Sequence, residues 1–416
     1  MAVDAPQTVT HDVVIVGGGM VGASLALALA PTGLRVLVIE AFEPGAADQP
    51  SFDERTSALG NGSRQVFEAL GLWSGLLPEA APIRRIHVSD AGHFGFARLD
   101  AAEFGQAALG YVVPNRVIGR ELWAALHRCP AVDIRLPARA LQVVLDADAA
   151  RVTYEHEGQR HEAIARLVVA ADGAQSLVRA AAGIGATRDD YDQTAIIAAL
   201  RSDAPDDGTA YERFTAAGPM AVLPLKVAAA GHWRALVWAA RPDEARALMA
   251  LDDASFLQRW QEAFGWRAGR AQQIGRRVAY PLALVRSGEA VATRAILLGN
   301  ASQSLHPVAG QGFNLGLRDA AALAEMLVDA VRRGEDIGAP ALLARFAAER
   351  GEDREGVVRF TDRLVRGFSD AGAARAALRN LGLLVFDLLP PAKRALSRIS
   401  FGFGGKSPRL SRGLPL

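Results

Sequence analysis

The chain has 416 residues, half of them hydrophobic, and a formal net charge of +1. This length suits two domains of roughly 100–200 residues each, and the near-neutral charge excludes a global attraction to a polyanion such as nucleic acid. The single cysteine, Cys129, excludes intramolecular disulfides and a cysteine-cluster metal site. With neither a secretory signal nor an apolar run of the roughly 18–20 residues that span a bilayer, we expect a cytoplasmic protein.

The chain begins with a predicted strand–turn–helix–strand unit. Residues 12–16 (DVVIV) are typical of a buried strand, residues 21–29 of a close-packed helix, and residues 35–40 (RVLVIE) of a second strand. Alternating strands and helices of this kind predict a parallel sheet.

The turn of this unit carries the glycine pattern GxGxxG. Gly17 permits the tight turn, Gly19 lets a pyrophosphate approach the backbone, and Gly22 lets the helix pack closely on the strand. Glu40, at the end of the second strand, can accept hydrogen bonds from ribose hydroxyls and would repel a 2′-phosphate. The unit therefore predicts binding of FAD or NAD(H) rather than NADP(H).

The middle of the chain is rich in predicted strands separated by Gly, Pro and Asp turns. Further strands are expected at 83–99, 111–118, 192–201, 211–225 and 233–240. Of these, 83–99 and 192–240 are interpreted as antiparallel sheet. Strand, tight turn and helix return at 166–182 and at 295–333, so a discontinuous nucleotide-binding domain is interrupted by a second domain.

A second polar turn follows the predicted strand at 166–171. Asp172 and Gly173 precede Ser176 and Arg179, which lie one helical turn apart. Asp before a helix is a good cap, so this turn is either a capped helix or part of the nucleotide site.

The stretch 296–319, ILLGNASQSLHPVAGQGFNLGLRD, again combines a strand, a glycine-rich loop and a helix. Such a helix N-terminus presents backbone N–H groups and the positive end of a helix dipole to an electron-rich ligand. Two turns of this kind suggest one long cofactor held at both ends.

The same stretch, with GGGMVG, ADGAQSLVR and FTAAGPMAVLPL, resembles the group A flavin monooxygenases over roughly residues 10–400. Within them it is similar to the ubiquinone-biosynthesis hydroxylase family, and to its branch that hydroxylates ring carbon C4 of 2-polyprenyl-6-methoxyphenol. The resemblance implies an α/β fold, in which a Rossmann-like FAD-binding domain of the aromatic-hydroxylase type carries an inserted, mostly antiparallel substrate domain and C-terminal helices. We expect the FAD-binding domain at 1–75, 115–190 and 286–360, the substrate domain at 76–114 and 191–285, and the helical region at 361–416.

The resemblance also implies roles for residues at matching positions. Those expected to bind the cofactor are Gly17, Gly19, Gly22, Glu40, Arg55, Arg120, Asp172, Gly173, Asn300, Pro307, Gly310, Gln311, Gly312 and Asn314. The ADP half would lie at the first four, the pyrophosphate near Arg55 and Arg120, and the isoalloxazine ring along 307–314. The broad family has Asp where this chain has Asn300, and Asn still offers an acceptor for a ribityl hydroxyl.

The implied reaction is hydroxylation of the phenol ring through a C4a-hydroperoxyflavin, with FAD as cofactor and NAD(P)H and O2 as co-substrates. A sister hydroxylase acting at another ring position or on another phenol is an alternative, and so is a non-catalytic flavin-binding scaffold in a biosynthetic complex. In each case no metal is required, and the substrate of the leading interpretation is a polyprenyl phenol.

Catalytic residues are not identified by sequence, and His306 and Gln311 are candidates. His306 either orients the phenol or passes a proton, or it is a loop residue bonded to backbone beside Pro307. The ring pocket is expected on the antiparallel sheet, although core packing explains each candidate equally well. These candidates are Tyr211, Phe214, Pro219, Leu223, Pro224 and Trp238.

The C-terminal region combines an apolar stretch at 378–391 with six basic and no acidic residues from 390 to 416. One interpretation is a helix docked on the core with a frayed basic tail. The other is a surface that contacts a biosynthetic complex or the inner face of the cytoplasmic membrane, since apolar area beside basic charge suits an anionic lipid surface.

Overall fold

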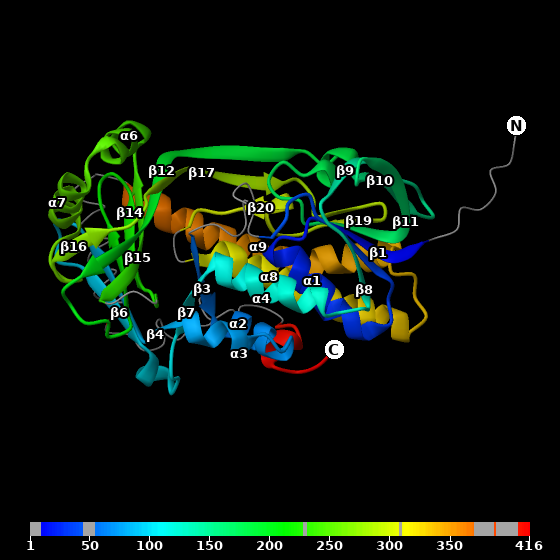
Figure 1. Cartoon of the computed structure of the whole chain (residues 1–416), viewed down its shortest axis with the longest axis horizontal. Helices are drawn as coiled ribbons and strands as arrows, with labels where there is room; N and C mark the ends of the chain where they lie inside the picture. The colour runs from blue at the N-terminus through cyan, green and yellow to red at the C-terminus, as the bar shows by residue number, and fades with distance from the viewer. Residues whose placement is uncertain (1–9, 45–54, 228–230, 308–309, 370–386, 388–406) are drawn as a thin grey trace, which may run out of the picture.

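The computed structural model describes residues 10–44, 55–227, 231–307, 310–369, 387 and 407–416. Within these residues the strands form sheets of eight, nine and three strands. Figure 1 shows the eight-stranded sheet at one end of the molecule and the nine-stranded sheet at the other, with the long strands β12 and β17 running between them.

Five parallel strands form the centre of the first sheet, in the order β8-β2-β1-β11-β19. They are β1 (His11–Val16), β2 (Val36–Ile39), β8 (Val132–Arg135), β11 (Gln159–Ala170) and β19 (Ala295–Leu297). Their near-continuous apolar sequences are typical of strands buried on both faces. Helix α1 (Met20–Leu29) joins β1 to β2, which confirms the predicted N-terminal unit.

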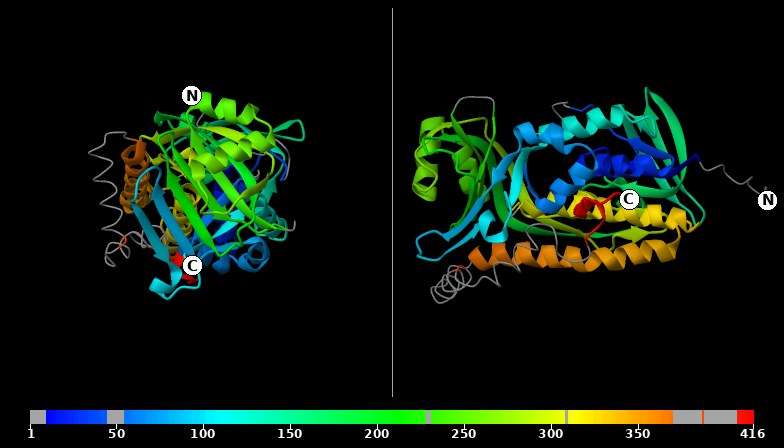
Figure 2. Two further views of the ribbon diagram at one scale, coloured as in Figure 1. Left: turned by 90° about the vertical axis from the view of Figure 1, so that its left-hand side faces the viewer. Right: turned by 90° about the horizontal axis from the view of Figure 1, so that it is seen from below.

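The two faces of this sheet are covered differently. On one face α1 packs against α4 (Asn115–His127) and α8 (Gln311–Arg332), and α9 (Pro340–Ser369) lies along α8 (Figure 2). The other face is covered by an antiparallel pair, β9 (Ala138–Leu145) and β10 (Ala150–His156), and by the short helix α5 (Leu177–Ala181).

The second sheet has the order β20-β17-β12-β15-β14-β13-β5-β6, with β16 (Ala271–Ile274) paired to β12. All its pairs are antiparallel except β13 with β5, so the expected antiparallel character is confirmed. Its other strands are β5 (Arg85–Asp90), β6 (Phe96–Asp100), β12 (Ala186–Ser202), β13 (Thr209–Phe214), β14 (Pro219–Pro224), β15 (His232–Ala240), β17 (Val278–Ser287) and β20 (Gln303–Ser304).

One face of this sheet packs against α6 (Pro242–Ala250) and α7 (Asp253–Phe264). The third sheet, β3 (Thr56–Gly60), β7 (Gly110–Pro114) and β4 (Ala81–Ile83), lies beside α2 (Asn61–Ala69). Strands from both halves of the chain thus build the second sheet, while the domain boundaries proposed from sequence stay a prediction.

The expected strand at 111–118 is wrong in its second half. Strand β7 ends at Pro114 and α4 begins at Asn115. Val117 and Ile118 are β-branched and therefore resemble strand residues, but both are fully buried on the face of α4 that packs against α1. Tertiary burial of a helical face has outweighed the local β-propensity.

The last ten residues are docked on the protein rather than frayed. Leu410 joins the main core, η6 (Leu410–Arg412) contacts α2, and the Arg409 amide donates to Glu325 Oε2 of α8 at 2.6 Å. The C-terminus lies beside α2 and α3 (Trp73–Leu76) in Figure 1. The apolar stretch 378–391 falls outside the described residues apart from Asp387. Within the described part of the chain, no helix is both long and apolar enough to cross a membrane.

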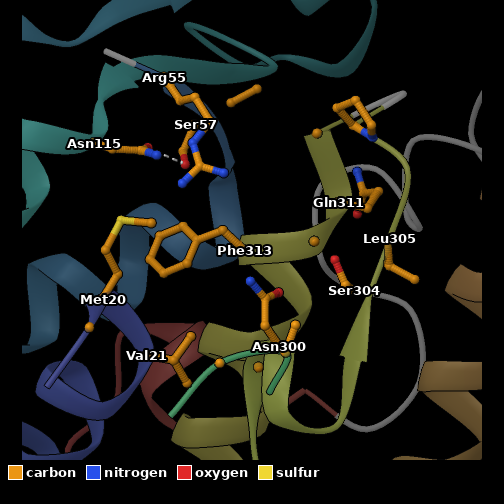
Figure 3. Close-up of a pocket in the computed structure, with 18 of the residues that line it drawn as sticks. Met20, Val21, Arg55, Ser57, Asn115, Asn300, Ser304, Leu305, Gln311 and Phe313 are labelled. Carbon is orange, nitrogen blue, oxygen red and sulfur yellow. Dashed lines mark hydrogen bonds between the residues drawn. The ribbon is translucent and has the colours of Figure 1, made fainter. Parts of the chain in front are cut away.

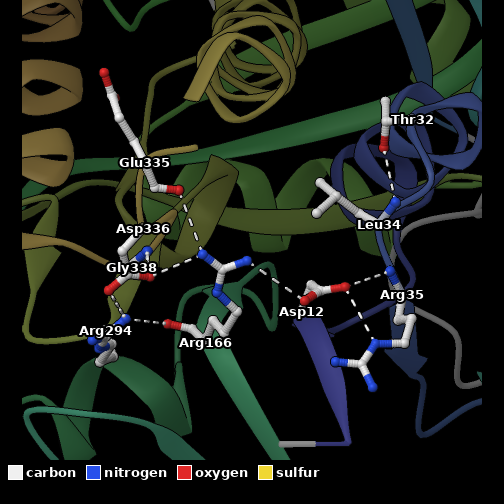
Figure 4. Close-up of polar contacts among 9 residues, drawn as sticks. All are labelled: Asp12, Thr32, Leu34, Arg35, Arg166, Arg294, Glu335, Asp336 and Gly338. Carbon is white, nitrogen blue, oxygen red and sulfur yellow. Dashed lines mark hydrogen bonds and ion pairs between the residues drawn. The ribbon is translucent and has the colours of Figure 1, made fainter. Parts of the chain in front are cut away.

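A polar network ties together the amino ends of the parallel strands (Figure 4). Arg166 of β11 lies 3.7 Å from Asp12 of β1 and 3.3 Å from Asp336, which follows α8. Arg294, just before β19, pairs with Asp336 at 2.6 Å. These ion pairs lie at the end of the strands opposite the glycine turns, so they fix the sheet without occupying the ligand side.

A buried ionic cluster joins α8 to α9. Asp319 is fully buried and accepts from Arg350 Nε at 2.7 Å and from Arg354 Nε at 2.9 Å. Asp353 contacts Arg350 and lies 3.5 Å from Arg318. The surrounding guanidinium groups more than offset desolvation, so they hold the pKa of Asp319 below its usual value.

We predict that Asp319→Asn strongly destabilises the protein, because it removes the buried carboxylate that pairs with both Arg350 and Arg354 and leaves Asp353 as the remaining partner of Arg350. Breaking a buried pair in this way costs about 3–5 kcal/mol. The control Glu355→Gln removes an exposed pair with Arg359 and is expected to cost about 0–1 kcal/mol. Urea unfolding of both variants checks the prediction, and equal midpoints would contradict it.

Candidate functional site

A cavity of about 1640 Å³ lies between the carboxyl ends of the parallel strands and the second sheet. Its lining comes from the turns that follow β1, β2, β11 and β19, from β3, and from one face of the second sheet. Figure 3 shows the central part, with Arg55, Ser57 and Asn115 on one side and Ser304, Leu305 and Gln311 on the other. Ligands of α/β folds commonly bind in such a crevice at the carboxyl ends of the strands.

The first glycine turn is closed by backbone contact. Gly17 has φ +99°, and a Cβ there would lie 2.4 Å from the Ala171 carbonyl oxygen. A Cβ on Gly22 would lie 2.0 Å from the Gly17 carbonyl oxygen. Gly19 is the N-cap of α1, so the helix N-terminus begins at the turn. Gly17 and Gly19 line the cavity. Gly22 does not line it and instead allows α1 to pack closely against the turn.

Glu40 lies next to this turn, as expected. Its carboxylate accepts hydrogen bonds from the Gly18 amide at 2.5 Å and from the Phe42 amide at 2.9 Å. Burial raises the pKa of this carboxyl more than the two amides lower it. Because Glu40 also lines the cavity, its remaining lone pairs can accept from a ligand hydroxyl.

The Asp172 turn has the contacts of a capped helix start, and its place in the nucleotide site stays a prediction. Asp172 Oδ2 accepts from the Leu177 amide at 2.7 Å, and Ser176 caps α5 by accepting from the Arg179 amide at 3.0 Å. Both Asp172 and Gly173 also line the cavity. Asp172 Oδ1 is buried without a protein partner in the described structure, and desolvation raises the pKa of this carboxyl. A buried acceptor at the cavity wall is suited to a ligand donor.

The third turn precedes α8. Gly310 is its N-cap with φ +59° and donates from its amide to Pro307 O at 3.0 Å. Asn300, Pro307, Gly310, Gln311 and Gly312 all line the cavity. Residues 308–309 of the predicted flavin-lining run lie outside the described structure.

Asn314 supports this turn from behind rather than lining the cavity. Its Oδ1 accepts from the Gly60 amide at 2.9 Å and from Ser63 Oγ at 2.6 Å. Its Nδ2 donates to Ala58 O and Gly310 O, both at 2.7 Å. The amide of Asn314 therefore ties β3 and α2 to the N-terminus of α8, and its predicted contact with the cofactor stays untested.

The two arginines expected near the pyrophosphate are placed differently. Arg55 lines the cavity, with its guanidinium carbon 5.0 Å from the centre of the Tyr280 ring. Arg120 lies on the exposed side of α4, where it pairs with Glu79 at 3.1 Å and with Glu121 at 3.0 Å. The structure does not bring Arg120 to the cavity lining.

His306 is buried at the cavity wall. Its Nε2 lies 3.1 Å from Gln193 Oε1, and the Tyr191 ring packs edge-on against it at 5.1 Å. Burial lowers the pKa of His306 to about 4, so the imidazole is neutral near pH 7. A neutral imidazole can donate and accept hydrogen bonds here but does not supply a proton as an imidazolium.

Half of the expected substrate-pocket residues line the cavity. Tyr211, Phe214 and Leu223 do so, whereas Pro219, Pro224 and Trp238 do not. Trp238 instead packs against Phe256 of α7, with ring centroids 5.7 Å apart. Successive strand residues face opposite sides of a sheet, so the aromatic side chain faces the helices while its neighbour Val237 faces the cavity.

Sequence analysis missed the acidic member of this wall, Glu212 of β13. It lines the cavity, and desolvation raises its pKa to about 7. The alternation in TAYERF was the available signal, since it places Ala210, Glu212 and Phe214 on one face. The predicted pocket residues were mainly aromatic, and they did not include Glu212 or its small aliphatic neighbours.

We predict that Gly22→Ala abolishes flavin binding, because the new methyl group cannot fit beside the Gly17 carbonyl. The control Gly351→Ala changes a helical glycine of α9 with no atom within 4 Å of its Cβ position, and should stabilise the protein by about 0.5–1 kcal/mol. The flavin-to-protein ratio after purification measures the first effect. A fully flavin-loaded Gly22→Ala variant would contradict the prediction.

We also predict that Glu212→Gln stabilises the cofactor-free protein at alkaline pH. The folded carboxyl, with a pKa of about 7, holds a proton that the unfolded chain releases near the ordinary glutamate pKa of 4.5. Wild-type stability therefore falls as pH rises through this window, and the neutral amide escapes that loss. Unfolding temperatures should differ at about pH 8 and converge at about pH 4. A constant difference across this range would refute the burial of the carboxyl.

Comparisons with known proteins identify the family of this chain. The model of the FAD binding domain family matches residues 10–361. A ubiquinone hydroxylase, UbiL, of Rhodospirillum rubrum is 41% identical over 97% of this chain and 93% of its own length. A 3-demethoxyubiquinol 3-hydroxylase of Escherichia coli is 34% identical over 94% of this chain and 98% of its own.

Among solved structures, p-nitrophenol 4-monooxygenase of Pseudomonas putida superposes with a TM-score of 0.78, over 96% of this chain and 100% of its own, at 20% identity. That likeness establishes the fold: an FAD-binding domain with a substrate domain. The chain therefore belongs to the FAD binding domain family, within the flavin-dependent monooxygenases that include the ubiquinone hydroxylases.

Proposed function

We propose that this FAD-dependent monooxygenase hydroxylates C4 of the ring of a 2-polyprenyl-6-methoxyphenol in ubiquinone biosynthesis, using NAD(P)H and O2. One observation supports this most directly: a single cavity joins the nucleotide-type glycine turns to an apolar face of the second sheet. A ligand held by the turns can thus share a space with an apolar ring.

The residues of the first two turns fit the adenosine and pyrophosphate parts of FAD. The backbone cradle at Gly17 has no room for a Cβ, and Glu40 offers carboxylate lone pairs beside it. Asp172 Oδ1 is a buried acceptor without a partner in the described residues. An extended ligand with ribose hydroxyls would satisfy both carboxylates.

The third turn fits the flavin end. When bound, FAD takes a hydride from NAD(P)H and, with O2, supplies the oxygen atom for transfer. The N-terminus of α8, at Gly310 to Gly312, opens on the cavity, and its dipole favours negative charge there. Asn300, from the turn after β19, offers both a donor and an acceptor to a ribityl hydroxyl.

The apolar wall suits the substrate. Ile86, Leu99, Ala210 and Leu223 line the cavity and pack together in a separate small core. A largely dry wall of this kind excludes water from the reacting atoms. The ring of a prenylated phenol could lie against it with its hydroxyl toward a polar group of the pocket.

A second ring position is supported by the relatives. The Escherichia coli protein, 34% identical to this chain, is named as a 3-hydroxylase of 3-demethoxyubiquinol. The same cavity could present a different ring carbon if the ring were rotated about its tail. The two candidates therefore differ in substrate and in the ring carbon that is hydroxylated, while the type of reaction is the same.

We predict that the purified flavin-loaded protein converts 2-methoxy-6-prenylphenol, with NADH or NADPH, to the product hydroxylated at C4. Mass spectrometry measures the added oxygen and NMR the ring position. The Gly22→Ala variant is the control without cofactor. Hydroxylation only at another carbon would select the second candidate, and no hydroxylation of any prenylated phenol would refute the proposed function.

A further inference from the structure

The cavity wall contains one continuous row of side chains across the second sheet. Strand pairing places Ile197, Val237, Ala221, Glu212, Val88 and Ala97 in register on six neighbouring strands. All six line the cavity. Five are aliphatic, so the carboxyl of Glu212 lies near the middle of an apolar row.

A second group of side chains on the same sheet is also aliphatic. Leu99, Ile86 and Ala210 are in register on β6, β5 and β13, Leu223 of β14 packs with them, and all four line the cavity. Among the cavity-lining residues that the structure describes on this sheet, Glu212 alone has a carboxyl group. A phenol ring against these side chains therefore has one carboxyl available to its hydroxyl.

Glu212 has no counter-charge in the described structure. Desolvation is the sole cause of its raised pKa, without an ion pair or a hydrogen bond that would lower it. The charged or titratable groups on the neighbouring strands β5 and β6 are Arg85, His87, Asp90, Arg98 and Asp100, and Arg213 follows Glu212 on β13.

The rest of the cavity lining, outside the second sheet, contributes further charged or titratable groups. They are Glu40, Arg55, Arg139, Asp172 and His306. Glu40 and Asp172 belong to the turns expected to hold the nucleotide part of the cofactor, where Glu40 accepts from the Gly18 amide and Asp172 Oδ2 accepts from the Leu177 amide. His306 is neutral beside Gln193. A carboxyl that lacks a partner yet faces the substrate space is available to the substrate itself.

We propose that Glu212 accepts the proton of the substrate's phenolic hydroxyl while the ring is hydroxylated. The O–H bond breaks, the proton moves to a Glu212 carboxylate oxygen, and the electron pair stays on the phenolic oxygen. Nothing is oxidised in this step, because O2 and NAD(P)H of the proposed reaction supply the oxidant and the electrons. The inference rests on the proposed function and adds a residue to it.

Loss of the phenolic proton makes the ring more reactive toward hydroxylation. Negative charge on the phenolic oxygen raises the electron density at the ring carbons ortho and para to it, and C4 of a 2-prenyl-6-methoxyphenol is the para carbon. A base that titrates near the working pH is the efficient choice for such a transfer. The aliphatic neighbours keep water from competing for the proton.

The test compares Glu212→Gln with wild type and with Glu262→Gln, which changes an exposed carboxylate of α7. Positioned general bases contribute about 10²–10⁴-fold, so we expect a loss in kcat of at least about 100-fold for Glu212→Gln. Its KM should stay within about threefold because the amide still accepts a hydrogen bond. The rise of wild-type kcat through about pH 7 should disappear in Glu212→Gln and persist in Glu262→Gln.

Two further measurements separate this role from damage to the fold. The rate of flavin reduction by NAD(P)H and the flavin content should match wild type in Glu212→Gln, while peroxide release rises in place of product. An unchanged kcat and pH profile in Glu212→Gln, with hydroxylation intact, would overturn the inference and leave the proposed function standing.

Substrate binding can be measured in a separate experiment that requires no turnover. Titration of oxidised flavin-loaded protein with 2-methoxy-6-prenylphenol, followed by flavin absorbance, should show tighter binding above about pH 7 in wild type, since a carboxylate accepts a stronger hydrogen bond than a carboxylic acid. Glu212→Gln should bind equally at each pH. Binding by wild type that is independent of pH would refute the role of Glu212 even if no hydroxylation occurs.

Discussion

The cofactor end of the structure depends on close backbone contact between three turns. Gly17 approaches the Ala171 carbonyl, and Val21 of α1 fits against Gly299 and Gly316, where added Cβ atoms would lie 3.2 and 3.0 Å from its Cγ2. These contacts bring the N-termini of α1 and α8 to the same edge of the sheet. Two helix dipoles thereby point into one cavity, an arrangement suited to a long ligand with charge at both ends.

The second sheet is held in a fixed relation to these turns by the segment between β19 and α8. Strand β20 pairs with β17 through Ser304 and Gln303, and His306 lies against Gln193 of β12. Asn314 then fastens the start of α8 to β3. One segment of the chain thus spans both sheets, so the wall expected to hold the substrate and the turns expected to hold the flavin are positioned by the same residues. Hydroxylation needs the substrate and the flavin to be held at a fixed relative position, because a small displacement of the reacting atoms slows the reaction.

The sequence was sufficient for the parts of the fold that local patterns specify. The N-terminal unit, the Asp172 turn and the entry into α8 follow from glycine spacing and apolar runs. The β9–β10 pair and the register of the second sheet could not be foreseen, since they depend on contacts between distant residues. The family resemblance implied a place near the pyrophosphate for Arg120. In the structure Arg120 instead pairs with Glu79 and Glu121 on the exposed side of α4. Glu212 shows the limit of looking for aromatic residues in an apolar wall.

Two acids of this chain, Asp319 and Glu212, show the difference between packing and function. Asp319 is surrounded by guanidinium groups, and its pKa is held below the usual value. Glu212 has no such partner, and its pKa is raised to about 7. An aliphatic residue such as its neighbours Val88 and Ala221 would fill the row without that desolvation cost. Stability therefore favours replacing Glu212, and a role at the substrate is the physical reason to retain it.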